Sequence, residues 1–309
     1  MDVQLIRTIL CSIALLTVSQ TAIAWSKPGH MVNAAIAYEE LQARDPRLAQ
    51  RIAELMAQHP DRGSFEVAIN GAKDEERLRR LFAEMARWSD DVRGGAYDHP
   101  TWHYASKPVV DPARPTATAP ADAFAGSAIE AFALNAKVAG DVRAPASERA
   151  VALCWIFHLV GDIHQPLHAA DWHSSKYPEG DLGGNRQFVL DPQTGQPTSL
   201  HGYWDGAVSR LGEAGPAFER GRELRARYPR SRFAELAAKP KASDFVAWAV
   251  ESNALARSQA YGSNLSTSPT PEKAPALSAA YIADSTARAE RQVTLAGYRL
   301  ADLLMVLMQ

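Results

Sequence analysis

The sequence predicts a single, mainly α-helical domain that carries one small β-hairpin. Apolar residues recur every three to four positions over most of the chain, which is the spacing of one face of a helix. Only residues 186–190 have the length and composition of a short strand, and they precede a turn-rich segment, so we expect a hairpin near 186–200. No internal repeat or change in composition marks a boundary within residues 25–309, which we therefore interpret as one domain.

The helices can be assigned in order along the chain. Asp45 and Pro46 supply an N-cap and an N1 proline to a helix that keeps one apolar face until Pro60. The other predicted helices cover residues 30–43, 75–89, 122–139, 147–164, 242–258 and 278–308. Residues 105–121 and 262–275 are rich in turn-forming residues, so we expect loops there.

The composition excludes several classes of protein. Of the 309 residues, 22% are charged and 46% are hydrophobic, a balance that excludes a disordered chain, a collagen and a coiled coil. The formal net charge is -2, which argues against a broad basic face that grips nucleic acid. Any attraction for a polyanion must therefore come from a local site.

The first residues have the pattern of a secretory signal peptide. Arg7 precedes an apolar segment, 8–19, and a small-x-small cleavage site at 22–24. Such a peptide would direct export to the periplasm or the medium, and its cleavage would make Trp25 the N-terminus. Only Cys154 would remain, so bound metal is a candidate for the stabilising role of a disulfide. No later segment approaches the about 18 apolar residues of a membrane span, so we expect no membrane anchor in the mature chain.

Histidine and aspartate recur at a spacing suited to metal binding. His158 and Asp162 form an H-x-x-x-D pair inside a predicted helix, His201 and Asp205 repeat it, and His168 lies between the two pairs. Side chains four residues apart share one face of a helix, so each pair can converge on one ion. Imidazole and carboxylate without thiolate suit a catalytic zinc site. A surface hydrogen bond is the alternative for any single pair, and the spacing does not give the number of ions.

Six motifs occur in the order typical of one family. They are WSKPGH (25–30), WSDDVR (88–93), WHY (102–104), HLVGDIHQPLH (158–168), GDLGGN (180–185) and LHGYWD (200–205). On these motifs the sequence resembles the S1/P1 nucleases. The resemblance implies an all-α domain of the type shared by zinc-dependent phospholipase C and P1 nuclease, which binds three zinc ions.

The resemblance also implies a set of zinc ligands. The first zinc would bind Asp90, His103, His158 and Asp162; the second would bind His168, His201 and Asp205; the third would bind His30, the bridging Asp162, and the backbone amine and carbonyl of Trp25. Only cleavage after residue 24 frees that amine, so the signal peptide and the third zinc are linked. The histidines at 59, 99, 164 and 173 are then expected on the surface or behind the ligands.

The implied activity is that of an endonuclease for single-stranded DNA and RNA that is also a 3′-nucleotidase. Three Zn²⁺ with three aspartates leave a local charge of about +3, which attracts a phosphodiester. Zinc can lower the pKa of bound water from 15.7 towards about 7, so we expect a zinc-bound hydroxide to attack phosphorus and leave 5′-phosphates on the products. Asp90 would orient or deprotonate that water.

Three further residues are candidates for contact with the substrate. Arg93 would meet the phosphate, unless it is only a solvated residue at a helix end. Tyr104 would stack on one base, which a duplex cannot present without unstacking. Asn185 would pair with a base edge, unless Gly-Gly-Asn is only a tight turn. Ser106 stands where the family often has an acidic or amide residue, so base preference can differ here.

Two other functions fit part of the pattern. A zinc-dependent phospholipase C would use similar metals, but we expect it to have a longer spacer between Trp25 and His30, and Glu in place of Asp205. A non-catalytic periplasmic zinc-binding protein would have closed sites or a His-rich tract, and neither is visible. We therefore expect a monomeric enzyme whose substrates are single-stranded nucleic acids and 3′-nucleotides.

Overall fold

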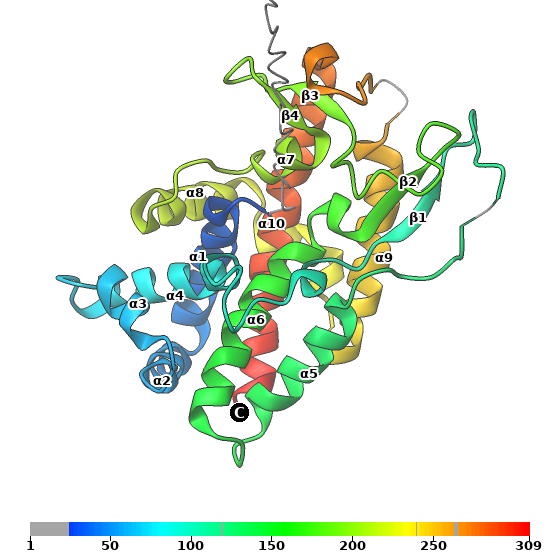
Figure 1. The fold of residues 1–309 in the computed structure, drawn as a ribbon. Coiled ribbons are helices and arrows are strands. Elements are labelled where there is room, and N and C mark those ends of the chain that lie inside the picture. The colour runs from blue at the N-terminus through cyan, green and yellow to red at the C-terminus, as the bar shows by residue number, and fades with distance from the viewer. Residues whose placement is uncertain (1–24, 119, 239, 263–264) are drawn as a thin grey trace, which may run out of the picture.

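The structure, a computed structural model, describes residues 25–118, 120–238, 240–262 and 265–309. Helices dominate this part of the chain (Figure 1). They are α1 (Lys27–Arg44), α2 (Pro46–Met56), α3 (Arg62–Ala68), α4 (Asp74–Asp91), α5 (Ala128–Gly140), α6 (Ala146–Ile163), α7 (Leu200–Asp205), α8 (Ala214–Arg227), α9 (Phe245–Leu255) and α10 (Ala279–Leu307). The strands are β1 (Lys107–Val110), β2 (Ala170–His173), β3 (Phe188–Leu190) and β4 (Pro197–Ser199). The predicted helical class is confirmed, while the predicted signal peptide lies outside the described residues.

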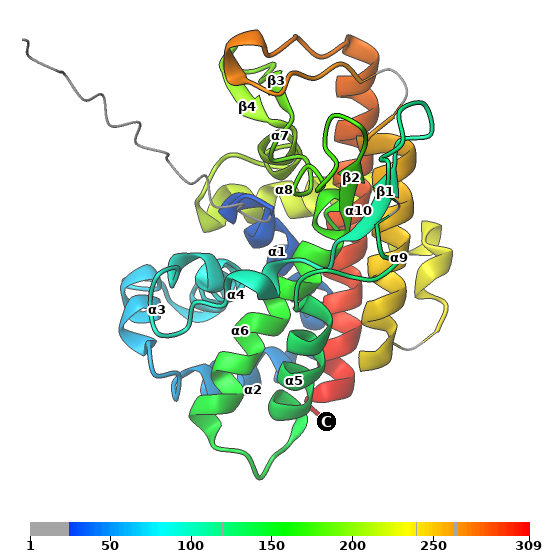
Figure 2. The same ribbon diagram turned by 45° about the vertical axis from the view of Figure 1, so that its right-hand side comes forward.

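Helices α1, α6 and α10 form the centre of the molecule. The long α10 runs beside α6 in both views (Figures 1 and 2), and α1 packs against α4, α8 and α10. Their facing side chains are fully buried, as Ile36, Phe157 and Leu300 illustrate. Where α1 crosses α10, a Cβ on Gly297 would lie 2.5 Å from the Cβ of Ile36, so only glycine permits this approach. The crossing fixes α1, which carries His30, against the rest of the core.

Most predicted helices occur close to their expected bounds. The cap of α2 is as predicted, because the carboxylate of Asp45 accepts the N–H of Leu48 at 3.1 Å. The helix predicted from residue 122 begins only at Ala128, because Ala125 pairs with Ser106 through two backbone hydrogen bonds. Helices α3, α7 and α8 were not predicted: the first two are very short, and the third contains glycine and proline and has only Phe218 and Leu224 as large apolar residues.

The predicted hairpin is present as β3 and β4, which pair antiparallel near one end of α10 (Figure 2). Its turn is closed by Asp191, whose carboxylate accepts the N–H groups of Gln193 and Thr194. This is the Asx-turn chemistry that favours aspartate at such positions. Among the described residues, no helix combines the length and apolar character that crossing a bilayer requires.

A second pair of strands was not predicted. β1 and β2 run parallel, with Lys107 opposite Ala170 and Val110 opposite His173. β1 lies within the segment that the sequence predicts to be a loop, so that prediction is wrong for these four residues. Parallel strands pair across a long connection, here one that contains α5 and α6, and such pairing leaves no local signal.

Candidate metal centre

Five histidines and three aspartates converge beside the C-terminal end of α6. They are His30 in α1, Asp90 in the last turn of α4, His103 and His168 in the 3₁₀ turns Pro100–His103 and Pro166–Ala169, His158 and Asp162 in α6, and His201 and Asp205 in α7. None is more than 5% exposed. Three groups have side chains placed to hold a metal ion, and the first two share His158: His30 with Asp90 and His158, His103 with His158 and Asp162, and His168 with His201 and Asp205.

Two helices each present a histidine and an aspartate one turn apart. In α6, His158 Nε2 lies 3.3 Å from Asp162 Oδ2, and in α7, His201 Nε2 lies 3.5 Å from Asp205 Oδ2. α7 has only six residues, and its start is fixed by Ser199, whose hydroxyl oxygen accepts the N–H of Gly202 at 3.0 Å. Both H-x-x-x-D motifs therefore have the geometry that their spacing predicts.

Three of the histidines are oriented by hydrogen bonds to backbone carbonyls. His158, His168 and His201 each donate from Nδ1, over 2.9, 2.5 and 2.7 Å respectively. The accepting carbonyls belong to Ala86, His103 and Gly183. A neutral imidazole that donates from Nδ1 keeps its lone pair on Nε2. Each of the three histidines, in its neutral form, therefore directs a lone pair from Nε2 into the cluster, as metal-binding histidines do.

The pair His168 and His201 shows most clearly that a cation fits. Their Nε2 atoms are 3.0 Å apart, and because both Nδ1 atoms already donate, two lone pairs face each other. A proton is poorly suited to this position, since burial lowers the pKa of His201 to about 3, reinforced by His168, and burial also lowers the pKa of His168. Asp205 carboxylate oxygens lie 3.5 and 3.9 Å from the two Nε2 atoms. A divalent cation would satisfy all three side chains.

Asp162 is the central carboxylate of the cluster. Its Oδ1 lies 3.0 Å from His30 Nε2, and its Oδ2 lies 3.3 Å from both His103 Nδ1 and His158 Nε2. These contacts lack the alignment of hydrogen bonds, so both buried oxygens of Asp162 have no hydrogen-bond partner, like the buried Oδ2 of Asp90. Buried polar atoms without partners are costly. Metal ions would supply the missing partners of this donor set.

The charges of the cluster depend on one another. Burial alone would raise the pKa values of Asp90 and Asp162, but the histidines hold both below their usual range, with His158 contributing most. In return, these two carboxylates outweigh the effect of burial on His158 and raise its pKa to about 9. Asp205 has no comparable cationic neighbour, and burial raises its pKa well above the usual range. A cation beside Asp205 would reverse that shift.

The chain at Trp25 adjoins a predicted ligand. Trp25 is fully buried, and the N–H of the next residue, Ser26, donates to the backbone carbonyl of Asp205 at 3.0 Å. The hydroxyl of Ser26 donates to the carbonyl of Ser209, also at 3.0 Å. These bonds tie the start of the described chain to α7. The role of Trp25 as a backbone ligand stays a prediction.

Arg93 and Tyr104 lie beside the predicted ligands. Arg93 donates from Nε and Nη2 to Oδ1 of Asp90, at 3.1 and 2.9 Å, and its side chain is 20% exposed. Tyr104 follows His103 and packs on Gly126, where a Cβ would lie 2.5 Å from the ring. Arg93 is thus an ion-pair partner of a predicted ligand, and its contact with phosphate stays a prediction, as does stacking on Tyr104.

The Gly-Gly-Asn turn has a role that the sequence did not reveal. The carbonyl of Gly183 accepts the Nδ1–H of His201, and Gly183 has a φ of 62° with a would-be Cβ only 2.6 Å from the carbonyl oxygen of Leu167. Glycine is therefore required to bring this carbonyl to the histidine. The amide of Asn185 donates to the carbonyl of Leu182 at 2.9 Å and closes the turn. Its contact with a base stays a prediction.

Gln165 is a further residue that the sequence did not single out. It is fully buried, and its Nε2 donates to Asp205 Oδ1 at 2.7 Å while its Oε1 accepts the N–H of Leu167 at 2.6 Å. These two bonds hold the Asp205 carboxylate in place. The sequence signal that could have identified Gln165 is its position between two histidines of the HLVGDIHQPLH motif.

The surface alternative is wrong for three of the four remaining histidines. His59, His164 and His173 are all buried. His164 donates from Nδ1 to a carbonyl of its own helix, and its Nε2 lies 2.9 Å from an Arg299 nitrogen, while His59 packs edge-on against Trp88. These contacts stabilise the helices around the centre.

Comparison of the sequence with protein families gives one match that covers nearly the whole chain. The family described as S1/P1 Nuclease matches residues 25–309. The chain belongs to the S1/P1 nuclease family. A comparison with curated proteins found no match. The S1/P1 nucleases are metal-dependent hydrolases, and the three buried groups of side chains that could hold metal ions are candidates for the centre that such an enzyme needs. The resemblance inferred from the six motifs is thereby confirmed.

Proposed function

We propose that this S1/P1 nuclease is a zinc enzyme that hydrolyses single-stranded DNA and RNA to products with 5′-phosphates and also acts on 3′-nucleotides. The observation that carries the proposal is the 3.0 Å approach of the Nε2 atoms of His168 and His201 beside Asp205. Two neutral imidazoles share such a position only with a cation between them. Nitrogen and oxygen donors without thiolate favour zinc among the common metals.

The donor set is large enough for three ions. Asp162 supports a bridging role, because its two oxygens face different histidines, Oδ1 towards His30 and Oδ2 towards His103 and His158. The backbone of Trp25 would complete the set around His30. Zinc held there would supply positive charge for the phosphate and lower the pKa of water from 15.7 towards about 7.

Residues of the chain would then orient the reaction. The Oδ2 atom of Asp90 is buried and has no hydrogen-bond partner, so it can accept the proton of an attacking water. The exposed part of Arg93 can donate to a phosphate oxygen while Nε stays with Asp90. Tyr104 would offer a ring for one unpaired base, which favours single strands. Asn185 would donate to a base edge if its bond to the turn opens.

We also propose that the enzyme works outside the cytoplasm, as a monomer. The predicted signal peptide supports export, and the family match begins at Trp25, the residue after the predicted cleavage site. Export would couple processing to activity, because only the cleaved chain carries a free α-amine at Trp25.

The test is a comparison of substrates with the correctly processed protein. Single-stranded DNA, RNA, duplex DNA, 3′-AMP and phosphatidylcholine are assayed side by side, before chelation, after chelation, and after readdition of zinc, manganese or magnesium. An Asp162→Asn variant serves as the control for contaminating nucleases. We expect cleavage of both single strands and of 3′-AMP, restored by zinc, with product ends that a ligase accepts because they carry 5′-phosphates.

Several results would overturn parts of the proposal. Turnover of phosphatidylcholine alone would indicate a phospholipase. Tight zinc binding without turnover of any substrate would indicate a zinc-binding protein. Full activity restored by magnesium but not by zinc would refute the metal assignment.

A further inference from the structure

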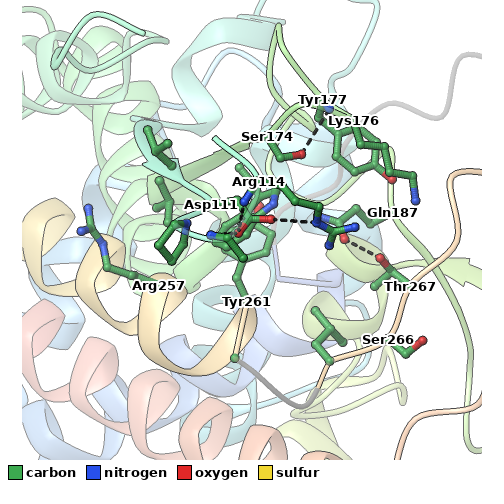
Figure 3. Close-up of a pocket in the computed structure, with 17 residues that line it drawn as sticks. Asp111, Arg114, Ser174, Lys176, Tyr177, Gln187, Arg257, Tyr261, Ser266 and Thr267 are labelled. Atoms are coloured by element: carbon green, nitrogen blue, oxygen red, sulfur yellow. Dashed lines mark hydrogen bonds and ion pairs between the residues drawn. The ribbon is translucent and has the colours of Figure 1, made fainter. Parts of the chain in front are cut away.

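A cavity among the described residues lies beside the metal centre rather than in it. Its volume is about 770 Å³, and β1, β2 and the segments around Tyr261 and Thr267 form its walls. Figure 3 shows that the polar and cationic side chains that line it come from separate segments. None of the proposed metal ligands lines it. The cavity is therefore a separate feature that the proposed reaction does not use.

One wall of the cavity is an aromatic surface that is held rigidly. The rings of Trp172 and Tyr261 lie 4.9 Å apart and are tilted by 30°. The buried carboxylate of Asp181 fixes both residues, because its Oδ1 accepts the hydroxyl of Tyr261 at 3.0 Å and the backbone N–H of Trp172 at 2.9 Å. Gln187 donates to the other oxygen at 2.8 Å. Tyr261 is buried while Trp172 is partly exposed, so part of the indole is accessible from the cavity that it lines.

The rim of the cavity is cationic. Arg114, Lys176 and Arg257 are exposed and come from three different segments (Figure 3). Asp111 is the acidic residue of the lining; its carboxylate accepts the N–H groups of residues 113 and 114 and lies 3.6 Å from Nε of Arg114. Three cations against one carboxylate leave a positive rim on a protein whose formal net charge is -2. A positive rim around a cavity lined by a partly exposed indole suits a nucleotide, which pairs an anionic phosphate with a flat base.

The two strands of the parallel pair connect the cavity with the metal centre. β1 begins four residues after His103, and β2 begins two residues after His168, and both strands end at the cavity wall. Trp172 is four residues from His168, and because His168 and Ala169 belong to a 3₁₀ turn, the two residues lie at most about 13 Å apart. A stacked strand has one phosphate per about 3.4 Å, so about four nucleotides would span that distance.

We propose that this cavity binds a distal nucleotide of the single strand that is being cleaved, with a base on Trp172 and phosphates at Arg114, Lys176 and Arg257. The inference rests on the proposed function and deepens it. It assigns to the enzyme a preference for strands of several nucleotides over dinucleotides. The cavity contributes to strand binding and takes no part in the chemical step.

The test compares two variants with the wild-type processed protein. The first replaces the three rim cations by glutamine (Arg114→Gln, Lys176→Gln and Arg257→Gln), and the second is Trp172→Ala. Binding is measured by fluorescence anisotropy with a single strand of about twelve nucleotides whose stereopure phosphorothioate linkages resist cleavage, over a range of salt concentrations. In parallel, kcat/KM is measured on strands from two to twelve nucleotides long.

We expect both variants to lose the advantage of long strands over dinucleotides. Loss of one stacked base corresponds to a 5- to 150-fold weaker binding of the long strand by Trp172→Ala, an order-of-magnitude range. Loss of three phosphate contacts would reduce the slope of log K against log salt by about 2. The triple variant changes only exposed ends of side chains, so it tests the proposal even if Trp172→Ala folds poorly.

A matched control removes the same charge at the other end of the molecule. Arg47, Lys137 and Arg143 are exposed on α2, on α5 and in the connection from α5 to α6, which lie opposite β1 and β2 in Figure 1. Their replacement by glutamine should leave the length dependence unchanged. Equal affinity and equal length dependence in wild type and triple variant would refute the cavity site. Absence of cleavage on every substrate by the wild type would instead refute the proposed function, and the binding arm would still decide on the cavity.

Discussion

Replacing Gly161 by alanine would displace a proposed metal ligand without removing any ligand atom. Gly161 precedes Asp162 in α6, and a Cβ at this position would lie 2.6 Å from His30 Nδ1 and 2.9 Å from its Cε1. Ordinary contact begins near 3.4 Å, so the imidazole would have to move by about 0.8 Å. It has no free space for this, because His30 is fully buried and stacked on His158 with 3.9 Å between ring centroids.

The expected effect is large on activity and at most moderate on stability. A misplacement of about 1 Å in an active site can reduce the rate by about 100-fold, so we expect a loss of that order in kcat/KM on single-stranded DNA. Alanine gains about 0.5–1 kcal/mol over glycine in a helix, while overpacking costs about 1–3 kcal/mol, so the free energy of unfolding should fall by no more than about 2.5 kcal/mol. Bound zinc should decrease, because one of the three ions would depend on His30.

The assay measures bound zinc, kcat/KM and thermal unfolding in parallel, with Gly63→Ala as the control. Gly63 lies in α3, and a Cβ there would meet no atom within 4 Å, so this variant should keep both zinc and activity. If Gly161→Ala retains its full zinc content and a rate within twofold of the wild type, then His30 is not a ligand whose position matters.

Four other changes test the remaining assignments. Asp162→Asn should cost more activity and more bound zinc than Asp205→Asn, because a bridging carboxylate serves two ions; equal zinc content in both variants would contradict the bridge. Tyr104→Ala should weaken binding of single strands by about 1–3 kcal/mol without loss of zinc, and an unaltered KM on short oligonucleotides would remove Tyr104 from the site. A methionine placed ahead of Trp25 turns its α-amine into an amide, so the bound zinc and the activity should both fall. Trp25→Phe should reduce both far less. Equal bound zinc and equal rates in the extended and processed proteins would exclude the N-terminal ligand. Burial raises the pKa of Asp181 to about 7, so ionisation of this carboxyl opposes folding, and the stability of the protein should fall as the pH rises from about 4 to 7. Asp181→Asn should flatten this part of the profile of unfolding temperature against pH. Parallel profiles for the wild type and the variant would refute the assignment.

The features that the sequence predicts well are those whose signal is local. The H-x-x-x-D spacing brings imidazole and carboxylate to one face wherever the chain is helical, as in the predicted α6 and in the unpredicted α7. The cap of α2 and the turn at Asp191 follow in the same way from residues three or fewer positions apart. In each case residues that are close in the sequence are also close in the structure.

The features that it misses depend on partners far along the chain. His158 bonds a carbonyl 72 residues before it, and His168 bonds one 65 residues before it. Periodicity carries no information about such pairs, and it could not reveal that β1 pairs with β2 or that Gly183 serves His201. Orientation of the ligands is thus a tertiary property, although the ligands themselves can be named from motifs.

Metal loading should determine how strongly the centre attracts its substrate. Without ions, the centre carries little net charge, because the ionised Asp90 and Asp162 are offset by His158, whose pKa is raised, and by Arg93, which pairs with Asp90. In the proposed three-zinc form the three aspartates and the three zinc ions give a centre of about +3, which attracts a phosphate strongly. Zinc would therefore strengthen the attraction of strands to the centre as well as being required for their cleavage. Strand binding by the metal-free protein would then depend on the cationic rim of Arg114, Lys176 and Arg257.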